Sequence, residues 1–191
     1  MRERKRAATR EAIQRHGLRL IGERGYDATT CEQIAAAAQV SPATFFRYFP
    51  TKEDVVLGDV YDPLIATAVR GRPAGESPLT SVRRALAQVL GALPAEEMES
   101  VRQRTALILS VPALRARSHE QQEELARHLS AVFSERGEGK VTDLEVQIAA
   151  WVCAAALAVA VERWAVEGAD LATQIDQALR AVAALTRRAK R

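Results

Sequence analysis

The stretch TCEQIAAAAQVSPATFFRYFPTKE, residues 30–53, contains three helix starts in close succession. Thr30 is followed three residues later by Gln33, which is the spacing of a capping box at a helix N-terminus. Ser41 precedes a proline, and proline at the first helical position lacks only an N–H group that has no partner inside the helix. Thr51 is a further N-cap candidate. The stretch therefore predicts two short helices joined by a tight turn, and the start of another.

Two short helices with a tight turn between them, the second rich in polar and aromatic residues, form the pattern of a helix-turn-helix. The alanines at residues 35–38 are small, so the first helix of the pair can lie close to the second. Ile34 and Val40 are expected to face inward and to fix the crossing of the helices. The second helix is short enough to present its first turn to base edges in a major groove. The pattern predicts a reader of double-stranded DNA.

Hydroxyl and cationic side chains lie where such a unit would meet the DNA backbone. Thr30 and Ser41, each at a helix N-terminus, would offer hydroxyl and backbone N–H groups to phosphates. Tyr48 and Lys52 would add a phenol and an ammonium beyond the second helix. Arg47 could reach a phosphate or a guanine edge, and its alternative interpretation is a solvated charge.

The charge distribution agrees with a DNA partner for the first quarter of the chain. The 191 residues carry a formal net charge of +3. Residues 1–52 contain ten Lys or Arg against five Asp or Glu, and residues 53–191 contain seventeen against nineteen. A basic segment on a near-neutral body indicates a polyanionic partner for that segment. A solvated basic face explains the charge alone equally well.

The pattern becomes specific in the string TFFRYFPTKE, residues 44–53. Over roughly residues 8–57, the sequence closely resembles the DNA-binding domain of the TetR family of repressors. The resemblance implies a homodimer whose third helix enters the major groove of a palindromic operator. It also implies a larger helical domain that senses a small-molecule effector. We therefore expect a repressor that the effector releases from DNA, and activation remains the alternative.

The resemblance also implies roles for single residues. Pro42 and Ala43 would face bases, and Thr44 would lie at the boundary between bases and phosphates. Phe45 and Phe49 match positions that pack inside the small domain. The residues expected at the DNA are Thr30, Ser41, Pro42, Ala43, Thr44, Phe46, Arg47, Tyr48 and Lys52.

Two positions depart from the family pattern. Phe46 stands where the family commonly has tyrosine, so a hydroxyl directed at phosphate is absent. Gln39 replaces the usual glycine before the turn. If Gln39 adopts a left-handed conformation, it costs about 1 kcal/mol relative to glycine.

The remaining sequence predicts an all-α fold, because helix-forming residues dominate and no stretch alternates with the period of a strand. We expect a DNA-binding domain over residues 1–52 and a ligand-binding and dimerisation domain over residues 53–191. A basic arm at residues 1–5 would precede the first helix, and Gly25 would end that helix with a left-handed turn. About nine helices are expected, the later ones over residues 52–69, 79–93, 95–110, 113–136, 143–167 and 171–188, with a loop at 71–78.

The segment at residues 143–167 is apolar almost all round, so its helix should be buried on several sides. In the family that it resembles, the last two helices pair with those of a second copy. We therefore expect residues 143–188 to form the homodimer interface.

A second, shorter resemblance bears on the effector. The stretch LILSVPALRAR, residues 107–117, is similar to regulators of the mycofactocin type, which implies an apolar or acyl effector. The ligand-contact candidates are Met98, Val101, Arg102, Leu107, Phe133 and Trp151. Ordinary core packing is the alternative for the apolar members, and a solvated charge is the alternative for Arg102.

An enzyme is not expected. His16, His119 and His128 form no metal-ligand spacing with each other or with the two cysteines, and no phosphate loop or nucleophile motif stands out. We expect no cofactor and no metal. Cys31 and Cys153 are expected to be reduced, in a cytoplasmic protein without a membrane partner. The competing interpretation is a helical module whose basic N-terminus binds an anionic membrane.

Overall fold

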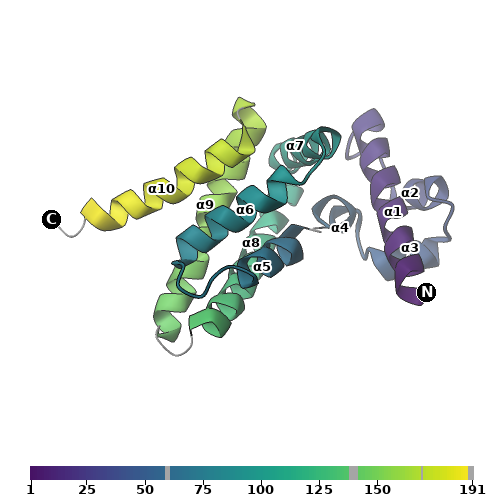
Figure 1. Ribbon diagram of the computed structural model, residues 1–191. Helices are drawn as coiled ribbons and strands as arrows, with labels where there is room; N and C mark the ends of the chain where they lie inside the picture. Colours follow the sequence, from purple (N-terminus) through teal and green to yellow (C-terminus); the bar gives the residue numbers. More distant parts are fainter. Residues whose placement is uncertain (59–60, 138–141, 169, 189–191) are drawn as a thin grey trace. The chain divides into compact units, whose positions relative to one another are not determined.

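The computed structural model describes residues 1–58, 61–137, 142–168 and 170–188, and every regular element in these ranges is an α-helix (Figure 1). The all-α prediction is therefore confirmed. The helices are α1 (Arg2–Arg24), α2 (Cys31–Ala37), α3 (Pro42–Tyr48), α4 (Lys52–Leu57), α5 (Tyr61–Arg70), α6 (Pro78–Gly91), α7 (Ala95–Ser110), α8 (Pro112–Gly137), α9 (Asp143–Glu167) and α10 (Leu171–Arg188).

These helices form two compact units. The first contains Met1–Gly58 together with Ile108–Arg117, and the second contains the described residues of 59–107 and 118–191. The first unit is thus larger than residues 1–52, because α4 and the junction of α7 with α8 belong to it. Helices α7 and α8 each have one part in each unit.

The first unit is built around a small core of aliphatic side chains and two phenylalanines. Phe45 on α3 and Phe49, the C-cap residue of this helix, are fully buried, as the family resemblance implied. Ile34 on α2 is fully buried as well, and Val40 packs partly buried against the same cluster. The predicted inward faces of both helices are therefore confirmed.

Helix α1 supports this core and departs from the sequence prediction at both ends. It begins at Arg2, so the expected arm at residues 1–5 is mostly helix. Gly25 does end it with a positive φ of 89°, but ψ is 158°, which is not the left-handed helical turn that we expected. In the middle of the helix, a Cβ on Gly17 would lie 2.6 Å from Cγ1 of Val55. Only glycine allows α1 to approach α4 this closely.

The predicted helix over residues 52–69 is two helices in the structure. Helix α4 ends at Leu57, and Gly58 leaves the helical conformation with ψ of 107°. The side-chain amide of Gln14 donates to the carbonyl oxygens of Val55 (3.2 Å) and Gly58 (2.7 Å). These bonds satisfy carbonyl groups that a continuing helix would have used, and this break accounts for ten helices instead of nine in the part of the chain that the structure describes.

The turn between α2 and α3 holds the one described non-glycine residue with positive φ. Gln39 has φ of 55°, so the left-handed conformation considered from the sequence is present. The N–H of Val40 donates to the Ala35 carbonyl (3.0 Å), and the N–H of Gln39 donates to the Ala36 carbonyl (3.0 Å). This pair of bonds is a Schellman motif, which ends a helix and reverses the chain within a few residues.

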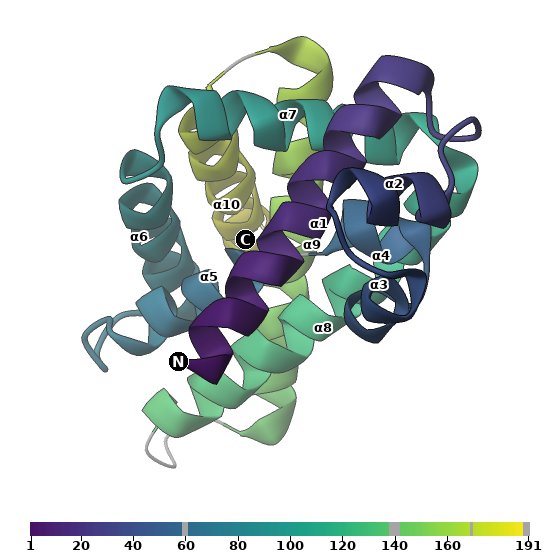
Figure 2. The same cartoon turned by 90° about the vertical axis from the view of Figure 1, so that its right-hand side faces the viewer.

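In the second unit, α10 packs along α9 and α6, and α5 packs against α6 (Figure 2). Their shared core includes Phe133, Trp164 and Cys153. Burial raises the pKa of the Cys153 thiol to about 12, and both cysteines are free. The predicted reduced, structural cysteines agree with this environment.

The loop before α6, predicted from its Gly and Pro content, carries an ion-pair cluster. Arg72 donates two hydrogen bonds to Glu76, which also accepts one from Arg84. The hydrogen bond from Arg72, with the further bond from Arg84, lowers the pKa of Glu76 to about 2, against the opposing effect of burial. Arg136 of α8 donates to the Pro73 carbonyl at 2.6 Å. The loop is therefore held to its own unit by charged side chains.

Replacing Gln39 with glycine should stabilise the protein, because glycine adopts positive φ without a Cβ clash. We expect Gln39→Gly to raise the free energy of unfolding by up to about 1 kcal/mol, measured by urea denaturation. The matched control is Ala38→Gly, since Ala38 has φ of −81° and gains nothing from the freedom of glycine. Ala38→Gly should destabilise, and a destabilised Gln39→Gly would contradict the strain argument.

Candidate DNA-binding face

Helices α2 and α3 begin as the sequence predicted. The Thr30 hydroxyl accepts from the N–H of Gln33 (3.3 Å), and the Gln33 side chain accepts from the N–H of Thr30 (3.1 Å), which completes the capping box. Ser41 Oγ accepts from the N–H of Thr44 at 3.1 Å and donates to the Thr44 hydroxyl at 2.9 Å. The hydroxyls of Thr30 and Ser41 thus already serve their own helices, although both residues are exposed.

One face of α3 is exposed, and it carries four of the predicted DNA-contacting residues. Pro42, Ala43, Phe46 and Arg47 are exposed, whereas Thr44 and Tyr48 are half-buried. Phe46 is 45% exposed. Its ring meets that of buried Phe45 edge to face, with 5.3 Å between centroids and an interplanar angle of 89°. The ring is therefore held by the core while its outer side faces solvent.

Two arginines lie at the C-terminal end of α3. The Arg47 guanidinium is 5.4 Å from the centroid of the Tyr48 ring. Arg10 of α1 donates to the Tyr48 carbonyl at 3.2 Å, and its guanidinium lies 4.4 Å from the Phe49 ring centroid. Sequence reasoning missed Arg10, because it reaches the end of α3 only through the packing of α1 against the other helices of the first unit.

Lys52 has partners that the sequence did not indicate. Its Nζ donates to the carbonyl oxygens of Tyr26 (2.7 Å) and Thr29 (3.2 Å), and it lies 4.1 Å from the centroid of the Tyr26 ring. The Tyr26 hydroxyl donates to Glu53. Burial and this hydrogen bond raise the pKa of Tyr26. Burial also acts to raise the pKa of Glu53, but the hydrogen bond from Tyr26 and the other hydrogen bonds that Glu53 accepts outweigh it, so the pKa of Glu53 is lowered. An ammonium has three donors, so one N–H of Lys52 remains for another acceptor.

Helix α4 begins at a second reciprocal cap, and an arginine from α8 joins it. The N–H of Thr51 donates to Asp54 Oδ2 (2.9 Å), and the N–H of Asp54 donates to the Thr51 hydroxyl (3.2 Å). Arg117 donates through Nη1 to Thr51 Oγ1 at 3.0 Å and through Nη2 to Asp54 Oδ1 at 2.7 Å. The start of α4 is therefore tied to the first turns of α8. The Thr51 cap was predicted, but the contribution of Arg117 was not.

The predicted effector contacts occupy several different environments. Phe133 is buried in the core of the second unit, and Met98 and Val101 pack against that core partly buried. Leu107 is half-buried. Arg102 is occupied by two hydrogen bonds of 2.8 Å to Glu99 on its own helix. Trp151 is 48% exposed on α9, so the structure does not bring it together with the others around a cavity.

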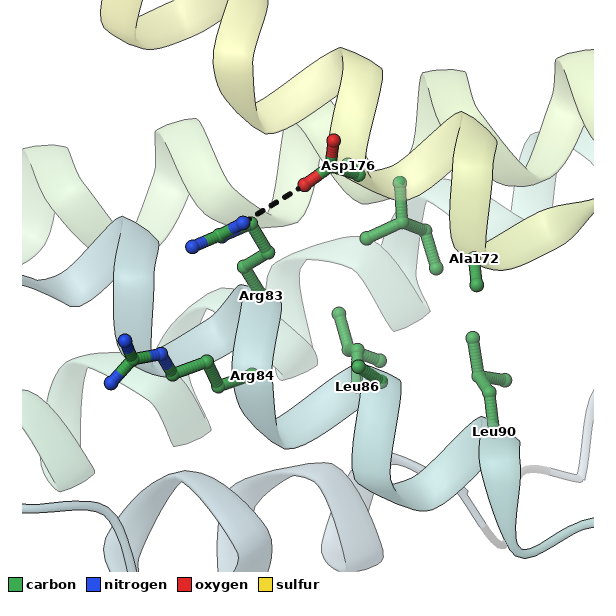
Figure 3. Close-up of a pocket in the computed structure, with 8 residues that line it drawn as sticks. Arg83, Arg84, Leu86, Leu90, Ala172 and Asp176 are labelled. Carbon is green, nitrogen blue, oxygen red and sulfur yellow. Dashed lines mark hydrogen bonds and ion pairs between the residues drawn. The ribbon is translucent and has the colours of Figure 1, made fainter.

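A cavity of about 250 Å³ lies between α6 and α10 (Figure 3). Leu86, Leu90, Ala172 and Ile175 are among its apolar lining residues, and Ala87 also contributes. Arg83 and Asp176 line it as well, joined by a 3.1 Å hydrogen bond, and Arg84 completes the lining. None of the six predicted effector residues lines this cavity. Across the described residues, no group of three or more His, Cys, Asp or Glu side chains could hold a metal ion.

The fold and the α2–α3 geometry are those of a helix-turn-helix transcriptional regulator. The family model for bacterial regulatory proteins of the tetR family matches residues 13–58, and the model for the MftR C-terminal domain matches residues 76–187. The chain therefore belongs to the TetR family of DNA-binding transcriptional regulators, with a C-terminal part of the MftR type. The resemblances seen in both halves of the sequence are confirmed.

Individual relatives agree with this assignment. The regulator TcmR of Streptomyces glaucescens is 36% identical over 143 residues, which span 71% of this chain but only 63% of TcmR. A Mycobacterium tuberculosis protein named MftR, after the regulation of mycofactocin biosynthesis, is 27% identical over 164 residues, covering 84% of this chain and 82% of that protein.

Solved structures share the fold. Thermus thermophilus FadR, a TetR-family repressor crystallised with lauroyl-CoA, superimposes with a TM-score of 0.56 at 28% identity, over 90% of this chain and 91% of that one. A TetR-family structure from Syntrophomonas wolfei gives a TM-score of 0.66 at 20% identity, over 92% and 93% of the two chains.

The link between Arg117 and Asp54 can be measured by a double-mutant cycle. Arg117→Met keeps the aliphatic stem and removes the charge, and Asp54→Asn removes the carboxylate. We expect a coupling free energy of about 1 kcal/mol in urea denaturation, because the pair is charged and hydrogen-bonded but partly exposed.

The control for this cycle is Arg127→Met, since Arg127 is exposed about 15 Å further along α8. Arg127→Met and Asp54→Asn should be additive. Equal coupling free energies in both cycles would mean that the coupling comes from nonspecific electrostatics, and this would contradict a direct bond between Arg117 and Asp54.

Proposed function

We propose that this chain is a cytoplasmic repressor that binds a palindromic operator as a homodimer and is released by a small, apolar effector. The observation that carries the proposal is the exposed face of α3, capped by Ser41 and backed by the buried Phe45 and Phe49. A short helix held rigidly from behind, with its front side chains uncovered, can enter a major groove without reorganising. The protein acts by binding and requires no cofactor or catalysis.

Phosphate contacts are expected around this face. Thr30 and Ser41 are exposed at the starts of α2 and α3, next to backbone N–H groups at each helix N-terminus. Tyr48 is half-buried beside Arg47, and Lys52 retains one N–H donor. Arg10 adds a cation that lies at the end of α3. Together these groups would position the duplex, while the front of α3 would read its sequence.

The outer face of α9 supports the homodimer. Its exposed apolar residues recur at intervals of three, four, seven and eight, so they form a single stripe, made of Leu144, Ile148, Trp151, Val159 and Val166. The opposite face, including Cys153 and Trp164, is buried in the core of its own unit. A stripe with this spacing, interrupted by exposed Glu162, is suited to packing against a second copy of the same helix.

Helix α9 is also long and apolar enough to cross a membrane, by length and composition alone. The described structure gives that alternative weak support, because α9 packs against α10 and α6 and supplies much of the core. Insertion into a bilayer would require those buried contacts to be broken. A second copy covers the stripe without disturbing them.

The effector is proposed to act through α7 and α8, which each have residues in both units. Met98, Val101 and Leu107 lie on α7, and Phe133 lies on α8. Both helices continue into the first unit, where Arg117 binds the start of α4. An apolar effector among these residues would shift α8 and, through Arg117, the position of α4. It must bind the non-DNA conformation more tightly, because a ligand with equal affinity for both states shifts nothing.

Selection of bound sequences from a random duplex library tests the DNA-binding proposal. We expect a palindrome whose half-sites are about 34–36 Å apart, with strong preference over random duplex. Arg47→Ala should weaken operator binding by at least about fivefold, whereas Arg19→Ala, which removes one charge from an exposed residue of α1, should change it much less. Salt-sensitive binding without any selected motif, or a preference for anionic vesicles, would overturn the proposal.

Charge placed in the α9 stripe tests the homodimer. Ile148→Glu combined with Trp151→Glu should convert a dimer to a monomer in light scattering at micromolar concentration, because two carboxylates cannot be buried against an identical apolar surface. Leu64→Glu is the matched control, since Leu64 is 50% exposed on α5, away from the stripe. A wild-type monomer under the same conditions would contradict the interface.

A further inference from the structure

The exposed face of α3 is chemically unusual for a surface expected to read DNA, because most of it is carbon. Pro42, Ala43 and Phe46 are exposed, and their side chains contain no hydrogen-bonding atom. Arg47 is the fourth exposed residue and carries the donors of this face. The Ser41 hydroxyl donates its proton to the Thr44 hydroxyl, and Thr44, which keeps its own O–H donor, is half-buried. The face can therefore form few direct hydrogen bonds to base edges.

Base edges in the major groove differ in what they offer to such a surface. Guanine, cytosine and adenine present donors and acceptors, whereas thymine also presents a 5-methyl group. A carbon surface gains from contact with that methyl and gains nothing from a donor or acceptor that it leaves without a partner. Among the four bases, thymine is therefore the one that the carbon part of this face, formed by Pro42, Ala43 and Phe46, can recognise.

We propose that α3 selects its operator mainly through the 5-methyl groups of thymines, with Phe46 as the principal contact. This proposal rests on the proposed binding of operator DNA through α3. The Phe46 ring is suited to the role because its edge-to-face contact with buried Phe45 fixes its direction, while 45% of the residue remains exposed. A ring that is already fixed loses little freedom when a methyl group packs against it. Arg47 supplies the one hydrogen-bonding contact of the face, to guanine or phosphate.

The contact is tested on the operator obtained by selection, with single thymines replaced by uracil. This replacement removes the methyl group and leaves base pairing and the hydrogen-bonding edge unchanged. We expect affinity to fall about fourfold at one or two positions of each half-site, the size expected for one buried methyl group. Uracil outside the half-sites should have no effect.

Phe46 variants assign the penalty to the ring. In Phe46→Ala the uracil penalty should disappear at the contacted position, and in Phe46→Tyr, which keeps the ring, it should remain. Arg47→Ala is the matched control, because it should weaken binding while retaining the full uracil penalty. Circular dichroism of each variant checks folding, which should be intact because neither side chain is buried.

Three results would be decisive against the proposal or its premise. A selected operator whose affinity is indifferent to uracil at every position would overturn thymine-methyl recognition and leave operator binding intact. A uracil penalty of equal size in wild type and Phe46→Ala would overturn the role of Phe46. Failure to select any motif would instead refute the proposed function itself.

Discussion

The hydrogen bonds that Arg117 donates to Thr51 and Asp54 determine how the first unit is completed. Thr51 and Asp54 already cap each other, so α4 can begin without help. Arg117 adds a partner from a distant part of the sequence, and with it the segment Ile108–Arg117 becomes part of the N-terminal unit. The capping residues of α4 therefore serve two purposes, since they start a helix and also receive a contact from α8.

The local features of the helix-turn-helix could be predicted from the sequence because each depends on residues a few positions apart. The caps at Thr30, Ser41 and Thr51 are of this kind. The left-handed conformation of Gln39 was considered for a different reason, because the family that the sequence resembles usually has glycine at this position. The burial of Phe45 and Phe49 came from the family resemblance and not from periodicity.

The features that were missed depend on contacts between distant segments. Arg10 reaches the end of α3, Gln14 satisfies the carbonyl groups at the end of α4, and Arg117 caps its start. None of these contacts can be predicted from the local sequence around either partner. The helix expected over residues 52–69 was wrong for this reason, since the amide of Gln14 compensates a break that helix propensity alone does not predict. Helix α9 shows the same limit, because its composition predicted burial on several sides but could not say which face a single chain leaves uncovered.

Gly17 has a consequence for modular engineering of DNA specificity. A side chain at Gly17 would collide with Val55 and crowd Ile34. The packing of α1 against α2 and α4 is therefore specific to the residues that this chain has at these positions. The reading segment at residues 30–53 is therefore not a cassette that can be exchanged between relatives by itself. A transplanted reader would bring its own Ile34 counterpart against a foreign α1, and it would lose the Arg10 contact at the end of α3. The smallest portable unit in this chain therefore contains α1 through α4 together with the segment Ile108–Arg117, which binds the start of α4.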